Sequence, residues 1–270
     1  MADYRDDDLT KLEQSGIPPL PPDGDSGVVF RDGASLWCAS WGSGPAVLLL
    51  HGGLGNAGNW GHQVPALLAA GYRVIVMDTR GHGRSSWDGT PFSYQRLADD
   101  ALAVLEHFGV MRAAIVGWSD GADTGLILAM AHPERVTGLV FFACNVDDSG
   151  TRPFEMTDAI GRIFARHVAD HAALSPDPGG FDVMNQAVGV MQGSQPNLSA
   201  TELAGVQVPV LSLIGEHDEC ITRAHAEYIA AAIPGARFQL LEEVSHFAAL
   251  QRPAAFNSAV LDFLARVALQ

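Results

Sequence analysis

The sequence predicts an α/β protein in which a mostly parallel sheet is covered by helices on both faces. Short apolar runs typical of buried strands recur along the chain, and helix-like stretches lie between most of them. A single G-x-S-x-G motif stands directly between one such strand and a helix. Strands that alternate with helices are joined as parallel neighbours, because each helix carries the chain back to the starting edge of the sheet.

The individual elements follow from apolar periodicity. Strands of the parallel part are predicted at residues 46–50, 73–77, 113–116, 136–142, 208–214 and 237–241. Helices are predicted at residues 94–108, 122–131, 224–233 and 253–267. Two earlier strands, at 28–31 and 35–40, are expected to form an antiparallel edge hairpin, because Asp32 and Gly33 between them favour a two-residue turn.

Two stretches depart from this alternation. Residues 1–27 are acidic and then proline-rich, which predicts a flexible tail without a core of its own. Residues 147–205 contain helical fragments but no convincing strand, so we expect a short helical cap inserted between two strands. The core domain then comprises residues 28–146 and 206–270.

Composition restricts the partners and the compartment. The net charge of −15 opposes binding to phosphate backbones and to anionic membrane surfaces. The charged N-terminal stretch lacks the apolar run of a signal peptide, and no segment has about 18 consecutive apolar residues. We therefore expect a cytoplasmic protein that binds neither nucleic acid nor membrane. Its three scattered cysteines, Cys38, Cys144 and Cys220, are expected to be free thiols.

The clearest chemical signal is Ser119, the serine of the G-x-S-x-G motif at residues 117–121. A serine on a tight turn between strand and helix is thrust out of the sheet, and glycines on either side leave room for a strained backbone. The start of the following helix also stabilises developing negative charge. An ordinary Gly-Ser turn is the alternative, but the strand and helix stand in the order that a nucleophile requires.

A serine hydroxyl needs a base and a group that orients the base. His246 follows the last predicted strand, and a parallel sheet brings the loops at its carboxyl edge together. His51, His82 and His132 are more easily structural. Asp218, after the strand at 208–214, is the expected acid. The candidates that compete with it are Glu216 and Glu219 nearby and Asp147 or Asp148 further away.

The glycine loop at residues 51–55 follows the central strand and offers backbone donors for an oxyanion. We expect one donor to be the N–H of Gly53 or Leu54 and the other to be the N–H of Asp120. A phosphate-binding loop is the alternative, but the spacing of its glycines fits neither nucleotide-binding pattern.

These residues together resemble the α/β-hydrolase superfamily over nearly all of residues 28–270. The landmarks are His51-Gly-Gly, Asp78-Thr-Arg-Gly-His-Gly-Arg-Ser, the motif at 117–121, and Gly-Glu-His-Asp218 followed by Ser-His246. The motif and the short insertion are similar to the valacyclovir-hydrolase-like (biphenyl hydrolase-like) branch. That resemblance implies that the Asp120 side chain holds the amino group of amino-acid esters. The family usually has glycine where this chain has Ser245.

Pocket residues are predicted less directly than the catalytic ones. Phe181, Met184, Val188 and Met191 form one helical stripe of the insertion, which fits either a substrate lining or packing of the cap onto the body. Trp60, Trp118, Met184 and Met191 are the candidates for substrate contact. The Asp120 side chain has two explanations, a substrate contact or a cap of the helix that follows.

The sequence therefore predicts a serine hydrolase that cleaves a small carboxylic ester through an acyl-enzyme, with no metal or cofactor and a small molecule as its partner. Two alternatives keep the same three residues and change the bond, to a lactone or enol-lactone or to a carbon–carbon bond. A third is a ligand-binding protein on the same scaffold, which has no need of all three residues. The oligomeric state is left open.

Overall fold

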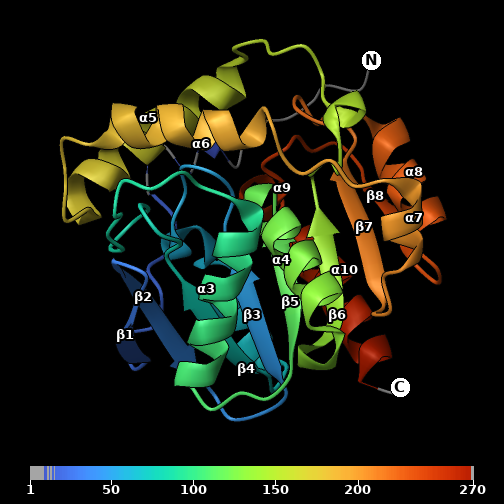
Figure 1. Ribbon diagram of the computed structural model, residues 1–270, viewed down its shortest axis with the longest axis horizontal. Coiled ribbons are helices and arrows are strands. Elements are labelled where there is room, and N and C mark those ends of the chain that lie inside the picture. Colours follow the sequence, from blue (N-terminus) through green and yellow to red (C-terminus); the bar gives the residue numbers. More distant parts are fainter. Residues whose placement is uncertain (1–8, 11, 13, 15, 269–270) are drawn as a thin grey trace.

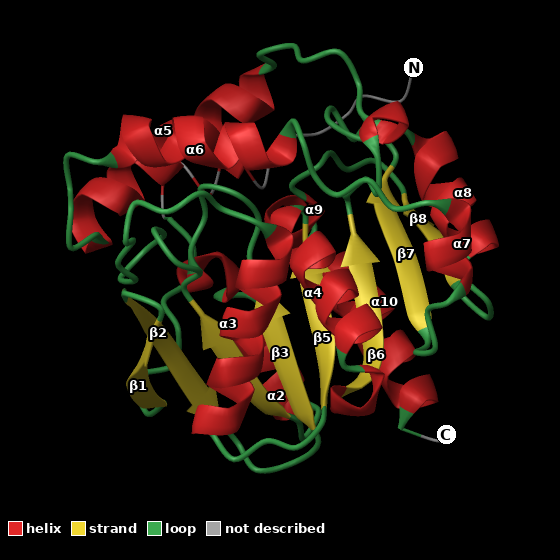
Figure 2. Ribbon diagram, in the orientation of Figure 1, coloured by secondary structure: helices red, strands yellow, loops and turns green. Residues whose placement is uncertain are grey.

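The structure is a computed structural model that describes residues 9–268 except 11, 13 and 15. An eight-stranded sheet runs through its centre (Figures 1 and 2). Its strands lie side by side in the order β1 (Asp25–Arg31), β2 (Ala34–Trp41), β4 (Arg73–Met77), β3 (Ala46–Leu50), β5 (Ala113–Trp118), β6 (Val136–Phe142), β7 (Val210–Gly215) and β8 (Arg237–Leu241). In this order β4 lies between β2 and β3, so the two strands β3 and β4 are exchanged relative to their order in the chain. This strand order confirms the α/β-hydrolase fold that the motifs predict.

The sheet is parallel from β4 to β8 and antiparallel at the other edge. The hairpin of β1 and β2 turns at Asp32 and Gly33, whose φ angles of 45° and 80° are those that a tight two-residue hairpin turn requires. The edge hairpin is thereby confirmed.

Helices cover both faces of the sheet, because alternate side chains of each buried strand point to opposite sides. Val47 and Leu49 face one layer, whereas Leu48 and Leu50 face the other. The first layer contains α2 (Gln63–Ala69), α9 (Ala248–Gln251) and α10 (Pro253–Val267). The second contains α3 (Tyr94–His107), α4 (Asp120–Ala131) and α8 (Arg223–Ala232). None of the helices in the described ranges is long and apolar enough to span a membrane.

Between β6 and β7 the chain forms α5 (Asp158–Leu174), α6 (Phe181–Gln192) and α7 (Ala200–Ala204). Figures 1 and 2 show α5 and α6 lying across the end of the sheet toward which the parallel strands run. The expected stripe of α6 is buried along its whole length and packs against Phe92, Tyr94 and Leu97 of the body. This contact holds the inserted helices over the carboxyl edge of the sheet.

The expectation of a flexible tail up to residue 27 needs correction at its C-terminal end. Strand β1 already begins at Asp25, and Ile17 and Leu20 pack against the core. The carbonyl of Pro21 accepts a hydrogen bond of 3.0 Å from the indole N–H of Trp41. Composition did not predict this packing, because it averages over many prolines and polar residues. Two apolar side chains are enough to attach the segment, since the core provides the surface against which they pack. Residues 1–8, 11, 13 and 15 of the expected tail lie outside the described residues.

Candidate active site

Ser119 occupies a sharp turn between β5 and α4. Its backbone has φ 52° and ψ −124°, a conformation that residues other than glycine rarely adopt. Gly117 and Gly121 make the turn possible. A Cβ on Gly117 would collide with the carbonyl oxygen of Gly121, and a Cβ on Gly121 would collide with that of Leu50. The local sequence thus places the serine hydroxyl at the carboxyl edge of the sheet on a strained but fixed backbone.

The His246 imidazole lies against the Asp218 carboxylate, with Nδ1 3.1 Å from each carboxylate oxygen. Asp218 follows β7 and His246 follows β8, and these neighbouring parallel strands bring the two loops together. Both side chains are buried. The backbone N–H groups of Cys220 and Ile221 donate to Asp218 Oδ1 at 2.9 and 2.8 Å, so the carboxylate is held in place.

The other candidate acids make different contacts. Glu219 accepts a hydrogen bond of 3.0 Å from the backbone N–H of His246, not from its ring. Glu216 accepts one of 3.0 Å from a backbone N–H in the loop after β8. Asp147 caps the short helix η3 (Asp148–Gly150), which includes Asp148. Among the candidates, the Asp218 side chain is the one in contact with the His246 ring.

The protonation of His246 depends on two opposing effects. Burial disfavours the charged imidazolium, but the negative charge of Asp218 and the hydrogen bond from Nδ1 favour it more. The net result is a pKa raised above the ordinary histidine value of 6.5. A base that holds a proton more firmly than a free imidazole is what the transfer of a serine proton requires.

The glycine loop lies directly beside the serine. A Cβ placed on Gly52 would be 3.2 Å from the Cβ of Ser119, and one on Gly53 would be 2.6 Å from a carboxylate oxygen of Asp120. Leu54 has φ 64°, which turns the loop back. As the first residue of α4, Asp120 has a backbone N–H without an intrahelical acceptor. The structure therefore places Gly53 beside Asp120 and on the cavity that Ser119 lines, and the role of Gly53 or Leu54 and Asp120 as oxyanion donors stays a prediction.

A small cavity of about 40 Å³ is lined by both Ser119 and His246. Its walls include Gly53, Trp118, Ser119, His167, His246 and Phe247. Of the expected substrate contacts, Trp118 is on this wall. Trp60 is not, because it is wholly buried behind Trp118, with ring centroids 6.3 Å apart. Met184 and Met191 are not on it either, because they are buried between α6 and the body. Substrate contact by Trp60, Met184 and Met191 therefore stays a prediction, and this cavity does not support it.

The Asp120 side chain does not cap its helix. Ser119 occupies the N-cap position, and no side-chain cap bond forms there. The carboxylate instead accepts a hydrogen bond of 2.9 Å from the Tyr94 hydroxyl and bonds of 3.1 Å from the Gln192 amide to both oxygens. Burial raises its pKa, although these hydrogen bonds act in the opposite direction. The helix-cap explanation is thus replaced by a link between the body and α6.

Two residues of the inserted helices reach the site without having been predicted. His167 of α5 lines the 40 Å³ cavity, and Gln192 at the end of α6 bonds to Asp120. For Gln192 the sequence offered no signal. For His167 it offered a weak one, since Ala159, Ile163, His167 and His171 recur every four residues on the buried face of α5.

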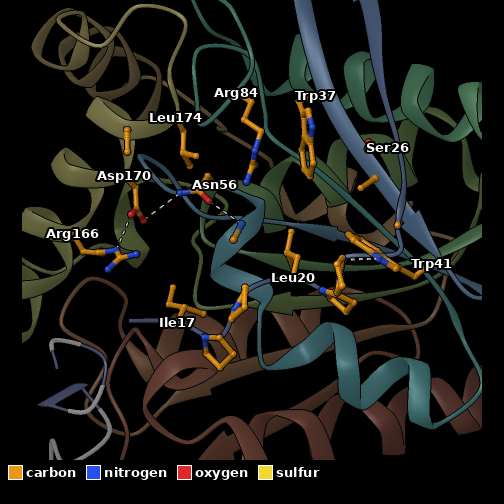
Figure 3. A pocket seen from close by; sticks show the side chains of 18 residues that line it. Ile17, Leu20, Ser26, Trp37, Trp41, Asn56, Arg84, Arg166, Asp170 and Leu174 are labelled. Atoms are coloured by element: carbon orange, nitrogen blue, oxygen red, sulfur yellow. Dashed lines mark hydrogen bonds and ion pairs between the residues drawn. The ribbon is translucent and has the colours of Figure 1, made fainter. Parts of the chain in front are cut away.

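A larger cavity of about 580 Å³ lies elsewhere, between residues 17–24, β2 and α5 (Figure 3). Neither Ser119 nor His246 is among the described residues that line it. Its two arginines are paired. Arg166 lies 2.7 Å from Asp170, and Arg84 lies 2.8 Å from Asp78 while stacking 4.1 Å from the Trp37 ring. Size alone would favour this cavity, but the smaller one holds the reactive groups.

One set of metal-ligand side chains occurs in the described part of the chain. Ligand atoms of Asp218, Cys220 and His246 lie within 4.8 Å of one another. Asp218 and His246 already bond to each other, and burial raises the pKa of the Cys220 thiol to about 12, which disfavours the thiolate that a metal needs. The arrangement suits proton transfer better than ion binding. All three cysteines are free, as expected.

Comparison with known proteins agrees with this geometry. Residues 45–170 match the model of the alpha/beta hydrolase fold family. The chain is 29% identical to Serine hydrolase BPHL of Homo sapiens, over 88% of this chain and 86% of that protein. It is also 42% identical to Epoxide hydrolase B of Mycobacterium tuberculosis, but that match spans only 28% of the relative and 36% of this chain.

Among solved structures, "Est816 as an N-Acyl homoserine lactone degrading enzyme" superimposes with a TM-score of 0.69 at 30% identity, over 88% of this chain and 100% of that one. The strand order, the strained serine turn and these similarities agree. The chain therefore belongs to the α/β-hydrolase fold family and has a serine hydrolase among the proteins similar to it.

Proposed function

We propose that the protein is a carboxylic-ester hydrolase that works through an acyl-enzyme on Ser119. The observation that carries the proposal is that Ser119 and His246 line the same cavity, while the carboxylate of Asp218 contacts Nδ1 of the imidazole. A nucleophile, a base and an acid that orients the base are what acyl transfer needs, and their order along this chain, serine, acid and then histidine, is the order found in α/β-hydrolases.

In the first half of the reaction, Ser119 Oγ attacks the carbonyl carbon of the ester and His246 accepts its proton. The negative charge that develops on the carbonyl oxygen is stabilised by the backbone N–H of Asp120 and that of Gly53 or Leu54. Asp218 stabilises the imidazolium. When the bond to the alkoxy oxygen breaks, His246 returns the proton to the departing alcohol, and the acyl group remains on Ser119.

In the second half, His246 takes a proton from water, and the resulting hydroxide attacks the acyl carbon. The same donors stabilise the second tetrahedral intermediate. His246 then protonates Ser119 Oγ as the acid leaves. The net change is hydrolysis, and every proton passes through one histidine.

A lactone is the second candidate substrate. A structurally similar protein is described as degrading an N-acyl homoserine lactone. Opening of a lactone uses the same steps, except that the leaving alcohol stays attached to the acyl group.

A panel of simple esters, lactones and diketones tests the reaction type. We expect turnover of esters or lactones by the wild-type protein and none by Ser119→Ala. Cleavage of the diketones in preference to both would replace the proposal by carbon–carbon bond hydrolysis. Turnover that survives in Ser119→Ala would remove Ser119 from the mechanism.

We further propose that α-amino esters are among the substrates, with the ammonium group bound by the Asp120 carboxylate. This carboxylate lies beside the glycine loop that receives the carbonyl oxygen. Gln192 already donates to both of its oxygens. An ammonium group must therefore compete with the Gln192 amide, and a charge-assisted bond is the stronger of the two.

Two substitutions separate this contact from a merely structural link. The measured quantity is the ratio of kcat/KM for an aminoacyl ester to that for an uncharged ester of the same size. Asp120→Asn should lower the ratio by about 10-fold to 100-fold, whereas Gln192→Met, which removes the competitor, should raise it. Equal changes on both esters in both variants would leave Asp120 as a link to α6 alone.

A further inference from the structure

His167 is a polar residue on the wall of the active-site cavity that the proposed mechanism does not use. It lies on α5, and its side chain is 7% exposed. The buried stripe of this helix begins with Ala159 and Ile163 and changes to histidine where the helix passes over Ser119. An apolar residue would continue the stripe and pack there at no cost in polar burial.

Among the described residues, the Nδ1 atom of His167 is buried without a hydrogen-bond partner. Leaving a polar group buried in this way destabilises the folded state. A polar side chain left partly unsatisfied in this way calls for an explanation beyond packing. The cavity that the imidazole lines is the one between Ser119 and His246.

The chemistry of the partner follows from the charge of the ring. Burial, together with the neighbouring His51, His82 and Arg166, lowers the pKa of His167 to about 3. A neutral imidazole carries one N–H donor and one acceptor, so it suits an uncharged hydrogen-bonding group and not an anion. It is also no rival to His246 as the base, because no carboxylate in the described part of the chain orients its ring.

We propose that His167 is a specificity-determining residue, which binds an uncharged oxygen substituent next to the scissile carbonyl of the substrate. The inference rests on the proposed ester or lactone hydrolysis. Because Ser119 and His167 line the same small cavity, the substituent must be attached close to the reacting carbon. The substrate class is therefore esters or lactones that carry a hydroxyl or keto group on the α or β carbon.

The test compares esters with and without the oxygen. The probes are ethyl 2-hydroxypropanoate against ethyl propanoate and ethyl 3-hydroxybutanoate against ethyl butanoate. A site that hydrogen-bonds a substrate hydroxyl rejects the analogue that lacks it. We expect the wild-type protein to prefer at least one oxygenated ester. His167→Leu should reduce that preference by about 10-fold or more, whereas His167→Asn, which keeps a donor and an acceptor, should retain part of it.

His171 provides the matched control. It lies one turn further along the same face of α5, is buried to a similar degree and also has an Nδ1 without a described partner, but it is not among the residues that line the Ser119 cavity. His171→Leu should leave the preference unchanged. His167→Phe, which keeps a flat ring in place, gives the same readout should the leucine variant fail to fold.

Stability distinguishes this role from simple packing. If His167 serves the substrate, His167→Leu should melt at the same temperature as the wild type or higher, because no polar atom is left unsatisfied. A lower melting temperature together with an unchanged ester preference would overturn the inference.

Labelling of Ser119 by a fluorophosphonate separates the two possible failures. If the wild-type protein and His167→Leu are both labelled but show the same preference, the role of His167 is wrong and the serine mechanism stands. If the wild-type protein is not labelled, the proposed function fails and the inference fails with it.

Discussion

Single residues at this site differ in the direction of their pKa shifts. His246 has a carboxylate partner, which raises its pKa against the effect of burial. His51, His82 and His167 are buried without one, and burial lowers their pKa values to about 4, 3 and 3. His246 is thus prepared to hold a proton during the reaction, whereas the other three histidines remain neutral.

At the residue scale, Ser119→Ala and His246→Ala should each lower kcat by roughly 10³-fold or more on any ester that the parent hydrolyses. The double variant should be little slower than either single variant, because the residues act as a unit. Circular dichroism should show the same fold in all three. Multiplied losses in the double variant would mean that the two residues act in separate steps.

The pH profile follows from the raised pKa of His246. The imidazole must be neutral to accept the serine proton, so kcat/KM should be low in acid and rise through an apparent pKa above 6.5. Asp218→Asn removes the charge that raises this pKa and leaves the effect of burial. Its rise should therefore move to lower pH, and its plateau should fall by roughly 10³ to 10⁴-fold. A rise that stays at the wild-type pH in Asp218→Asn would contradict the pairing.

At the scale of elements, the features that could be predicted from the sequence are those that depend on residues close together in the chain. The strand and helix on either side of Ser119 and the turn at Asp32 and Gly33 depend on neighbours in the chain. The contacts of His167 and Gln192 were not predictable in this way, because they depend on how α5 and α6 pack onto the body. The same reason explains the packed segment at residues 16–24, where composition alone indicated a tail.

Two glycines of similar appearance in the sequence should respond in opposite ways to alanine. Gly121→Ala places a Cβ against the backbone of Leu50 and should destabilise the fold by at least about 2 kcal/mol. Gly189→Ala, inside α6 with no atom within 4 Å of the added Cβ, should stabilise it by about 0.5–1 kcal/mol. Denaturant unfolding measures both changes. A tolerated alanine at 121 would contradict the close approach of the turn to β3.

At the scale of the whole molecule, the parallel sheet explains why residues 119, 218 and 246 meet. They follow β5, β7 and β8, whose ends lie at one edge, and the chain order of the motifs was enough to predict this. The cavity itself was not predictable, because its closing wall belongs to the insertion between β6 and β7.

The buried neutral histidines also affect the stability of the whole molecule in acid. His82 has a folded pKa of about 3 against an ordinary value of 6.5. As the pH falls from about 6.5 toward 3, the unfolded chain binds a proton that the folded chain refuses, so the stability present at higher pH is lost. His82→Asn removes this titration and offers an amide to the carbonyl of Arg80, which His82 Nδ1 contacts at 2.9 Å. The melting temperature of the variant minus that of the wild type should therefore increase as the pH is lowered from 7 to 5. A constant difference would contradict the neutral state of His82.

The central claim is that Ser119 is the activated nucleophile, and stoichiometric labelling followed by intact-mass and peptide analysis tests it most directly. The account predicts that a fluorophosphonate adds one group per chain, on Ser119, with no adduct in Ser119→Ala and much slower labelling in His246→Ala. An unlabelled wild-type protein, or an adduct that persists in Ser119→Ala, would contradict it.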